Sequence, residues 1–175
     1  MNWILLLSLV GYCLCKEYKA VDQIDLNEYS GKWFQVYKNS FDNLFQGDGT
    51  CATAQYSLQE NGQVKVYNEQ LDSNGKPDGI DGYAYYKDGD CCGYLTVQLE
   101  DLKPAPYWVL ELGPVENKQY QYSIVSDDKA ISLFVLTRNV EVFQKKYEDR
   151  VLSTIREFGF TKPWNKPIPM NQTDC

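Results

Sequence analysis

The stretch SGKWFQVYKN, residues 30–39, places a glycine and a tryptophan on either side of a lysine and then alternates apolar with polar side chains. A period of two is typical of a β-strand, because successive side chains point to opposite faces of a sheet. The stretch therefore predicts a strand with two different faces. One face carries Trp33, Gln35 and Tyr37, and the other carries Phe34 and Val36.

Seven further alternating runs follow, separated by clusters of Gly, Pro, Asn and Asp, the residues that make turns. Short strands joined by short turns predict an up-and-down antiparallel sheet, and eight strands can close into a barrel that holds one small ligand. A two-sheet sandwich is the alternative. The expected strands are residues 32–38, 50–58, 63–71, 80–87, 93–100, 107–112, 119–126 and 130–138.

The apolar pattern changes to a helical period after the last of these runs. Its apolar positions are spaced by four, four, four and three residues, and a glycine at 159 fits the position just past a helix end. The pattern predicts one amphipathic helix over about 143–158, followed by an extended, proline-rich tail, 159–175. The expected fold is thus all-β, an eight-stranded up-and-down antiparallel β-barrel with one C-terminal α-helix packed on the outside. The helical positions are Phe143, Tyr147, Val151, Ile155 and Phe158.

Residues 1–15, MNWILLLSLVGYCLC, carry no charge and contain an apolar run too short to span a bilayer. We interpret them as a signal peptide removed after Cys15, which leaves residues 16–175 as a single domain that is secreted and extracellular. A buried N-terminal strand or helix is the alternative. No second apolar run approaches membrane-spanning length.

Four cysteines remain once residues 1–15 are set aside, an even number for an oxidising compartment. Four cysteines allow three pairings, and a bridge between the adjacent Cys91 and Cys92 would be strained, because their Cα atoms lie only about 3.8 Å apart. The residues alone leave the pairing with Cys51 and Cys175 open. The sequon at Asn171 is a candidate glycosylation site.

The composition argues against several function classes. The net charge is −7 with no block of five like charges, which argues against nucleic acid as a partner. No histidine is present, so mechanisms that need imidazole as acid, base or metal ligand are excluded. The acidic pairs Asp88/Asp90 and Asp127/Asp128 lie in expected turns, where Asp makes local hydrogen bonds, so we expect no metal site, no catalytic residue and no enzyme.

The longest loop, NSFDNLFQGDG, joins the first two expected strands. It carries three large apolar side chains, Phe41, Leu44 and Phe45, among polar residues. Such a loop at a barrel mouth is interpreted as a lid that can make transient membrane contact, with packing over the core as the alternative.

A barrel of eight strands followed by one helix, opened by Gly31-Lys32-Trp33 and closed by Arg138, resembles a lipocalin. In that family the tryptophan of G-x-W lies across the closed end, and an arginine from the last strand stacks on its ring. The runs 51–71, 105–112 and 136–139 are similar to the branch that contains apolipoprotein D and the bilin-binding proteins. The resemblance covers nearly all of residues 16–175.

The resemblance implies a disulfide between Cys51 and Cys175 that holds the tail. It leaves Cys91 with Cys92, for which a strained vicinal bridge is the resulting hypothesis. In the family, a second common bridge joins a cysteine near the mature N-terminus to a cysteine on the seventh strand. Here Ser126 occupies the position on the seventh strand, so that bridge has no partner. The T-D-Y motif of the family is absent after the sixth strand, so the closed end there cannot be carried over.

The resemblance also implies a secreted carrier that binds a small hydrophobic ligand inside the barrel, with no required cofactor beyond a bound bilin, carotenoid or lipid. Trp33 becomes the floor, Gln35 and Tyr37 point into the cavity, and Tyr67, Tyr83 and Tyr85 are assigned to either face. One alternative is an enzyme or antioxidant acting on lipids, which needs a free thiol or a reactive methionine, and of the methionines only Met170 lies outside residues 1–15. The other alternative is a protein-interaction or inhibitor module. The implied cavity residues are Tyr56, Asn68, Gln98, Tyr107, Phe134 and Leu136.

Overall fold

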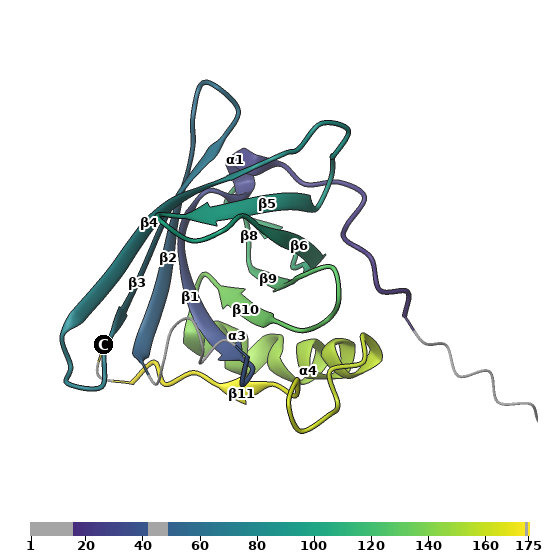
Figure 1. The fold of residues 1–175 in the computed structure, drawn as a ribbon. Coiled ribbons are helices and arrows are strands. Elements are labelled where there is room, and N and C mark those ends of the chain that lie inside the picture. Colours follow the sequence, from purple (N-terminus) through teal and green to yellow (C-terminus); the bar gives the residue numbers. More distant parts are fainter. Residues whose placement is uncertain (1–15, 42–48, 174) are drawn as a thin grey trace, which may run out of the picture.

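The computed structural model describes residues 16–41, 49–173 and 175. Eight antiparallel strands each pair with their neighbours, and the last pairs back to the first, which closes the sheet into a barrel (Figure 1). The expected barrel is confirmed and the sandwich is not formed. The barrel strands are β1 (Gly31–Lys38), β2 (Thr50–Leu58), β3 (Val64–Leu71), β4 (Pro77–Tyr85), β5 (Tyr94–Leu99), β6 (Ala105–Leu112), β9 (Tyr122–Ser126) and β10 (Leu133–Thr137).

The C-terminal helical segment differs from the expected single helix over 143–158. It consists of α3 (Val140–Lys146) and α4 (Glu148–Glu157), which meet at Tyr147. It begins earlier than expected because the Asn139 side chain accepts a hydrogen bond from the Val142 N–H and caps the first turn. It ends as expected at Gly159, whose φ of +91° allows the N–H groups of residues 159 and 160 to bond back into the last turn.

Helices α3 and α4 cover one wall of the barrel (Figure 1). Apolar side chains on the outer face of β1, β6, β9 and β10 pack against this helical wall, so those strands are buried on both faces. No helix within the described residues is long and apolar enough to cross a membrane. The fully buried residues of this outer core include Ile124, Leu133, Val135, Phe143, Val151 and Ile155.

A β-bulge in β1 corrects the expected direction of Tyr37. The pairing with β10 shifts register between Gln35 and Tyr37, so one extra residue interrupts the alternation. Gln35 faces the cavity as expected, whereas Tyr37 turns outward, packs against Phe143 and donates a hydrogen bond of 2.8 Å to Glu148. The prediction that Tyr37 points into the cavity is therefore wrong, because the bulge reverses the faces after Gln35.

Three short elements build the closed end of the barrel. Two of them were not predicted, and the third is the first part of the expected strand 119–126, which the structure divides into two strands. Helix α1 (Leu26–Tyr29) begins at Asp25, whose side chain accepts a hydrogen bond from the Asn27 N–H. Strands β7 (Val115–Glu116) and β8 (Gln119–Tyr120) form a hairpin where the family motif is missing. Its two turn residues, 117 and 118, have φ of 52° and 61°, as a tight hairpin turn requires.

The tail is held along the barrel wall by a disulfide between Cys51 and Cys175 and by strand β11 (Ile168–Pro169), which pairs with β1. The Met170 N–H donates to the Val36 carbonyl, and the Gln172 side chain donates to two further main-chain carbonyls of β1 and β2. Asn171 is exposed in this tail, and its glycosylation stays a prediction.

Cys91 and Cys92 are free thiols, so the expected vicinal disulfide is wrong. Both residues lie in the turn before β5, where Cys92 adopts a left-handed conformation with φ of 69° and the Tyr94 N–H donates to the Cys91 carbonyl. Adjacent Cα atoms are too close for an unstrained bridge, and this turn does not relieve that constraint. Hydrogen bonding with Cys91 and then burial raise the pKa of the Cys92 thiol.

Candidate functional site: a deep cavity with a polar floor

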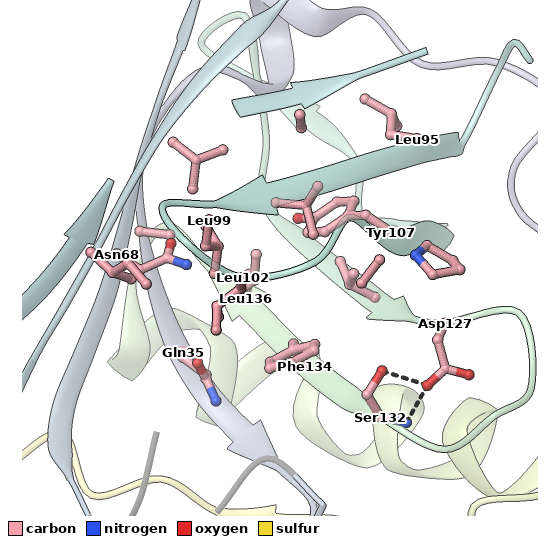
Figure 2. A pocket seen from close by; sticks show the side chains of 18 of the residues that line it. Gln35, Asn68, Leu95, Leu99, Leu102, Tyr107, Asp127, Ser132, Phe134 and Leu136 are labelled. Atoms are coloured by element: carbon pink, nitrogen blue, oxygen red, sulfur yellow. Dashed lines mark hydrogen bonds between the residues drawn. The ribbon is translucent and has the colours of Figure 1, made fainter. Parts of the chain in front are cut away.

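The barrel encloses a cavity of about 870 Å³. Side chains from the inner faces of the strands line its walls, and residues of the connections β5–β6 and β9–β10, with the adjoining ends of β3 and β4, surround its mouth. Figure 2 shows Leu95, Leu99, Phe134 and Leu136 around the interior, with the amide groups of Gln35 and Asn68 among them. The walls are therefore mainly apolar, with a few polar groups, as in sites for small ligands.

Five of the six residues implied by the family resemblance line this cavity, and Gln98 does not. In β5, Leu95, Val97 and Leu99 face inward, so period two sends Gln98 to the outer surface, where it is exposed opposite Tyr83. An assignment that is one residue out of register reverses the face, which explains the error. Tyr67, Tyr83 and Tyr85 are not among the lining residues, and the first two are exposed on the outside.

Trp33 and Arg138 close the bottom of the barrel, as the resemblance implies. Trp33 is fully buried and its indole N–H donates to the Tyr29 carbonyl over 2.8 Å. The guanidinium carbon of Arg138 lies 3.5 Å from the centre of the indole ring, a cation–π contact. Gly31 has a φ of +101°, and a Cβ there would lie 3.3 Å from the guanidinium, so the neighbouring glycine leaves room for the stack.

The guanidinium of Arg138 also ties the closed end together. Its nitrogens donate five hydrogen bonds of 2.7–3.2 Å to main-chain carbonyls. Burial lowers the pKa of Arg138 to about 10, so the group stays charged at physiological pH. The accepting carbonyls belong to Glu28, Tyr29, Ser30, Lys32 and Tyr120.

Directly above this floor, three phenol groups meet in one hydrogen-bonded chain, which we call the tyrosine hub (Tyr29, Tyr56 and Tyr107). The hydroxyl of Tyr107 lies 2.7 Å from that of Tyr29 and 3.1 Å from that of Tyr56. The Tyr29 hydroxyl is also 3.1 Å from the Ser123 hydroxyl. The rings of Tyr29 and Tyr56 stack at 5.7 Å between centroids, so four hydroxyls from α1, β2, β6 and β9 form one polar patch.

Burial keeps the phenols of the tyrosine hub neutral. It raises the pKa of Tyr29 to about 12 and raises the pKa values of Tyr56 and Tyr107 further above their ordinary value. Removing the charged phenolate form from water is the largest cause of each of these shifts. At physiological pH the hub therefore consists of hydroxyl groups that both donate and accept hydrogen bonds.

These pKa values predict loss of stability in alkali. A buried tyrosine whose pKa is higher in the folded than in the unfolded chain stabilises the fold below pH ~10, the unfolded value, and this contribution disappears as the pH rises through the folded value. For Tyr29, the stabilising contribution should therefore be lost between pH 10 and a pH of about 12. We expect absorbance at 295 nm to show a late-titrating group of tyrosines that ionises together with unfolding by circular dichroism. In concentrated denaturant all tyrosines should titrate near pH 10 instead, and late tyrosines there would contradict the prediction.

All charged residues that line the cavity lie near its mouth. Asp127 is fixed there, since its carboxylate accepts hydrogen bonds from the main-chain N–H groups of residues 129, 131 and 132 and from the Ser132 hydroxyl (Figure 2). Phe41 lines the cavity, whereas Leu44 and Phe45 lie outside the described residues, so the lid and its membrane contact stay predictions. The charged lining residues are Glu69, Asp78, Glu100, Lys103, Asp127, Asp128 and Lys129.

The sequence analysis missed Tyr29 and Ser123, which complete the polar patch. Tyr29 lies on α1, and the only local signal is Asp25 followed three residues later by Glu28, a weak version of a helix-start pattern. Within the described residues, no three Cys, Asp or Glu side chains are grouped as a metal site would require. The free thiols of Cys91 and Cys92 are not among the lining residues of the cavity.

Comparison with known proteins gives consistent matches. A family model for a lipocalin-like domain matches residues 24–166. Apolipoprotein D of Cavia porcellus is 38% identical over 99 residues, which are 55% of this chain and 50% of that protein. Outer membrane lipoprotein Blc of Vibrio cholerae is 29% identical over 143 residues, 81% of this chain and 80% of that protein. The chain thus spans about half the length of the apolipoprotein D that it matches.

Among solved structures, insecticyanin from the tobacco hornworm Manduca sexta superposes with a TM-score of 0.67 at 19% identity. The superposition covers 91% of this chain and 87% of that one. At this identity the likeness concerns the fold, and it agrees with the closed eight-stranded barrel.

Proposed function

Because the chain belongs to the lipocalin family, we propose that it is a non-catalytic carrier of one small hydrophobic molecule held inside the barrel. The observation that carries this proposal is the cavity of about 870 Å³, which is closed below by Trp33 and Arg138 and lined mainly by apolar side chains. Burial of a ligand there is favoured by about 25 cal/mol for each Å² of apolar surface removed from water. Steroids, retinoids, carotenoids, bilins and fatty acids are the ligand classes within this proposal.

We also place the protein outside the reducing interior of the cell. The disulfide between Cys51 and Cys175 supports this location, because such bridges persist in oxidising compartments. An enzyme that uses a free thiol on a bound lipid is less well supported, since Cys91 and Cys92 do not line the cavity. Nothing in the site favours an inhibitor over a carrier.

The carrier proposal predicts that filling the cavity abolishes binding. Val97→Trp introduces a large side chain on the inner face of β5, where Val97 lines the cavity. We expect its affinity for Nile red, a neutral fluorescent dye, to fall by about tenfold or more, which corresponds to ~1.4 kcal/mol of binding free energy. Titration of dye fluorescence measures this affinity.

The matched control is Val115→Trp, because Val115 is 46% exposed on β7 and is not a lining residue. It should bind the dye as the unmodified protein does. Circular dichroism and thermal unfolding establish that both variants are folded. If a folded Val97→Trp protein binds Nile red with unchanged affinity, the dye binds elsewhere and the proposal is wrong.

A further inference from the structure

We propose that the tyrosine hub is a binding subsite for a neutral oxygen-bearing group, so that the carried molecule is an alcohol or ketone and not a carboxylate. This inference rests on the proposed carrier function and selects among its ligand classes. It follows from the hydrogen-bonding capacity of the hub, from the position of charges around the cavity and from a polar wall group without a partner.

The hub can serve a hydroxyl or a carbonyl equally well. In each of its two contacts, 2.7 Å to Tyr29 and 3.1 Å to Tyr56, either oxygen can be the donor. If Tyr107 accepts from both neighbours, its own O–H is left to donate to a ligand carbonyl. If Tyr107 donates to one neighbour, a lone pair is left for a ligand hydroxyl. All three hub tyrosines line the cavity, and Tyr107 is the least buried of them, since it is half-buried whereas Tyr29 and Tyr56 are buried.

No positive charge faces this subsite among the described lining residues. The lysines that line the cavity, Lys103 and Lys129, lie at the mouth, where acidic residues outnumber them. Arg138 is not a lining residue: its guanidinium stacks on Trp33 and donates to main-chain carbonyls. The charge of Arg138 lowers the pKa values of Tyr29 and Tyr56 only slightly against the larger effect of burial, and its guanidinium is already bound to main-chain carbonyls. A carboxylate beside the hub would therefore lose its hydration without gaining a hydrogen-bonded ion pair, which opposes binding.

Asn68 supplies an independent polar signal higher on the wall. Its Oδ1 atom is buried and accepts no hydrogen bond in the described structure, and its side chain points into the cavity (Figure 2). In β3, Asn68 lies two residues beyond Val66, the partner of Tyr56 across the sheet, and is thus about 7 Å nearer the mouth. A buried acceptor without a donor is costly, so this position favours a ligand that supplies a donor group.

The test compares two probes with the same apolar skeleton, all-trans-retinol and all-trans-retinoic acid, by quenching of tryptophan fluorescence. At pH 7.4 we expect retinol to bind at least about tenfold more tightly, because on the order of one carboxyl group in a thousand is neutral at that pH. Between pH 7.5 and 5.5 the affinity for the acid should rise by about tenfold per pH unit, because only its neutral form fits. The affinity for retinol should stay constant.

A variant of the hub separates a specific contact from general burial. Tyr107→Phe keeps the ring and removes the central hydroxyl, so its affinity for retinol should fall about five- to tenfold. Its affinity for diphenylhexatriene, a hydrocarbon without oxygen, should not fall. The control is Tyr83→Phe, which removes a hydroxyl from a tyrosine that is 47% exposed on the outer wall and should leave both affinities unchanged.

The possible results are distinguishable. Retinoic acid that binds as tightly as retinol with no pH dependence, or retinol binding that is unaffected by Tyr107→Phe, overturns the subsite while leaving the carrier function intact. Binding of diphenylhexatriene without either retinoid also overturns it. If none of the three probes binds, the carrier function itself fails.

Discussion

Arg138→Met is expected to lower the free energy of unfolding by about 3–5 kcal/mol, the cost of removing one partner from a buried charged network. The substitution retains an apolar stem over Trp33 but removes the donor of five hydrogen bonds to main-chain carbonyls. These carbonyls belong to α1 and the residue after it, to the start of β1 and to the β7–β8 hairpin, so one guanidinium links three segments at the closed end. Their unpaired carbonyls would remain partly buried, so the loss exceeds that of ordinary surface contacts.

Urea-induced unfolding followed by tryptophan fluorescence measures this change. The free energy of unfolding of Arg138→Lys should lie between those of Arg138→Met and the unmodified protein. The lysine ammonium keeps the positive charge, but it lacks the planar fork of donors with which arginine contacts several carbonyls at once. Arg156→Met is the matched control, since Arg156 is exposed on α4, and its effect should stay within about 0.5 kcal/mol. A loss at Arg138 as small as that at Arg156 would show that the closed end does not depend on the guanidinium.

Removal of the disulfide by Cys175→Ala is expected to lower the free energy of unfolding by about 4–5 kcal/mol. The bridge joins residues separated by 124 positions, and a cross-link that closes so long a loop strongly restricts the unfolded chain. Without the bridge, the pairing of β11 with β1 and the hydrogen bonds of Gln172 to β1 and β2 would also be weakened, because the end of the tail would no longer be fixed. The expected loss is a large part of the stability of a typical domain.

Chemical unfolding in the presence and absence of a reducing agent measures this contribution. The reduced protein should match Cys175→Ala, and the reducing agent should not destabilise that variant further. Cys91→Ala is the control, because Cys91 is an exposed free thiol and its replacement should cost little. Destabilisation of Cys91→Ala similar to that of Cys175→Ala would contradict the assignment of Cys91 as free.

The alternation of apolar residues predicted the strands, their order and an up-and-down sheet that can close into a barrel, because each strand buries one face and the turns between them are short. The pairing of β10 with β1 decided between the closed barrel and the two-sheet sandwich. The stack of Arg138 on Trp33 and the bridge from Cys51 to Cys175 came from family resemblance, and both are present. Helix α1 and strand β7 were not predicted, and β8 was not separated from β9, because segments of two to four residues carry almost no periodic signal.

The errors in the candidate site have two physical causes. Gln98 was assigned inward, but a one-residue difference in register exchanges the faces of a strand, and the inner residues of β5 are Leu95, Val97 and Leu99. Tyr37 was assigned inward by simple alternation, which cannot anticipate an extra residue in the pairing of β1 with β10. In both cases the partner strand determined the direction of the side chain.

By itself, the sequence determined the all-β class of the protein: eight alternating runs followed by a helical segment predict an up-and-down sheet with two different faces, and the pairing of β10 with β1 closes that sheet into a barrel. Periodicity predicts this class because it depends only on the order of apolar and polar residues that are close together in the chain. It cannot predict which hydroxyl groups will be in contact, because Tyr29, Tyr56 and Tyr107 belong to α1, β2 and β6, which are far apart in sequence. Closure of the barrel brings them together above Trp33, so the polar floor of the cavity arises only from long-range packing.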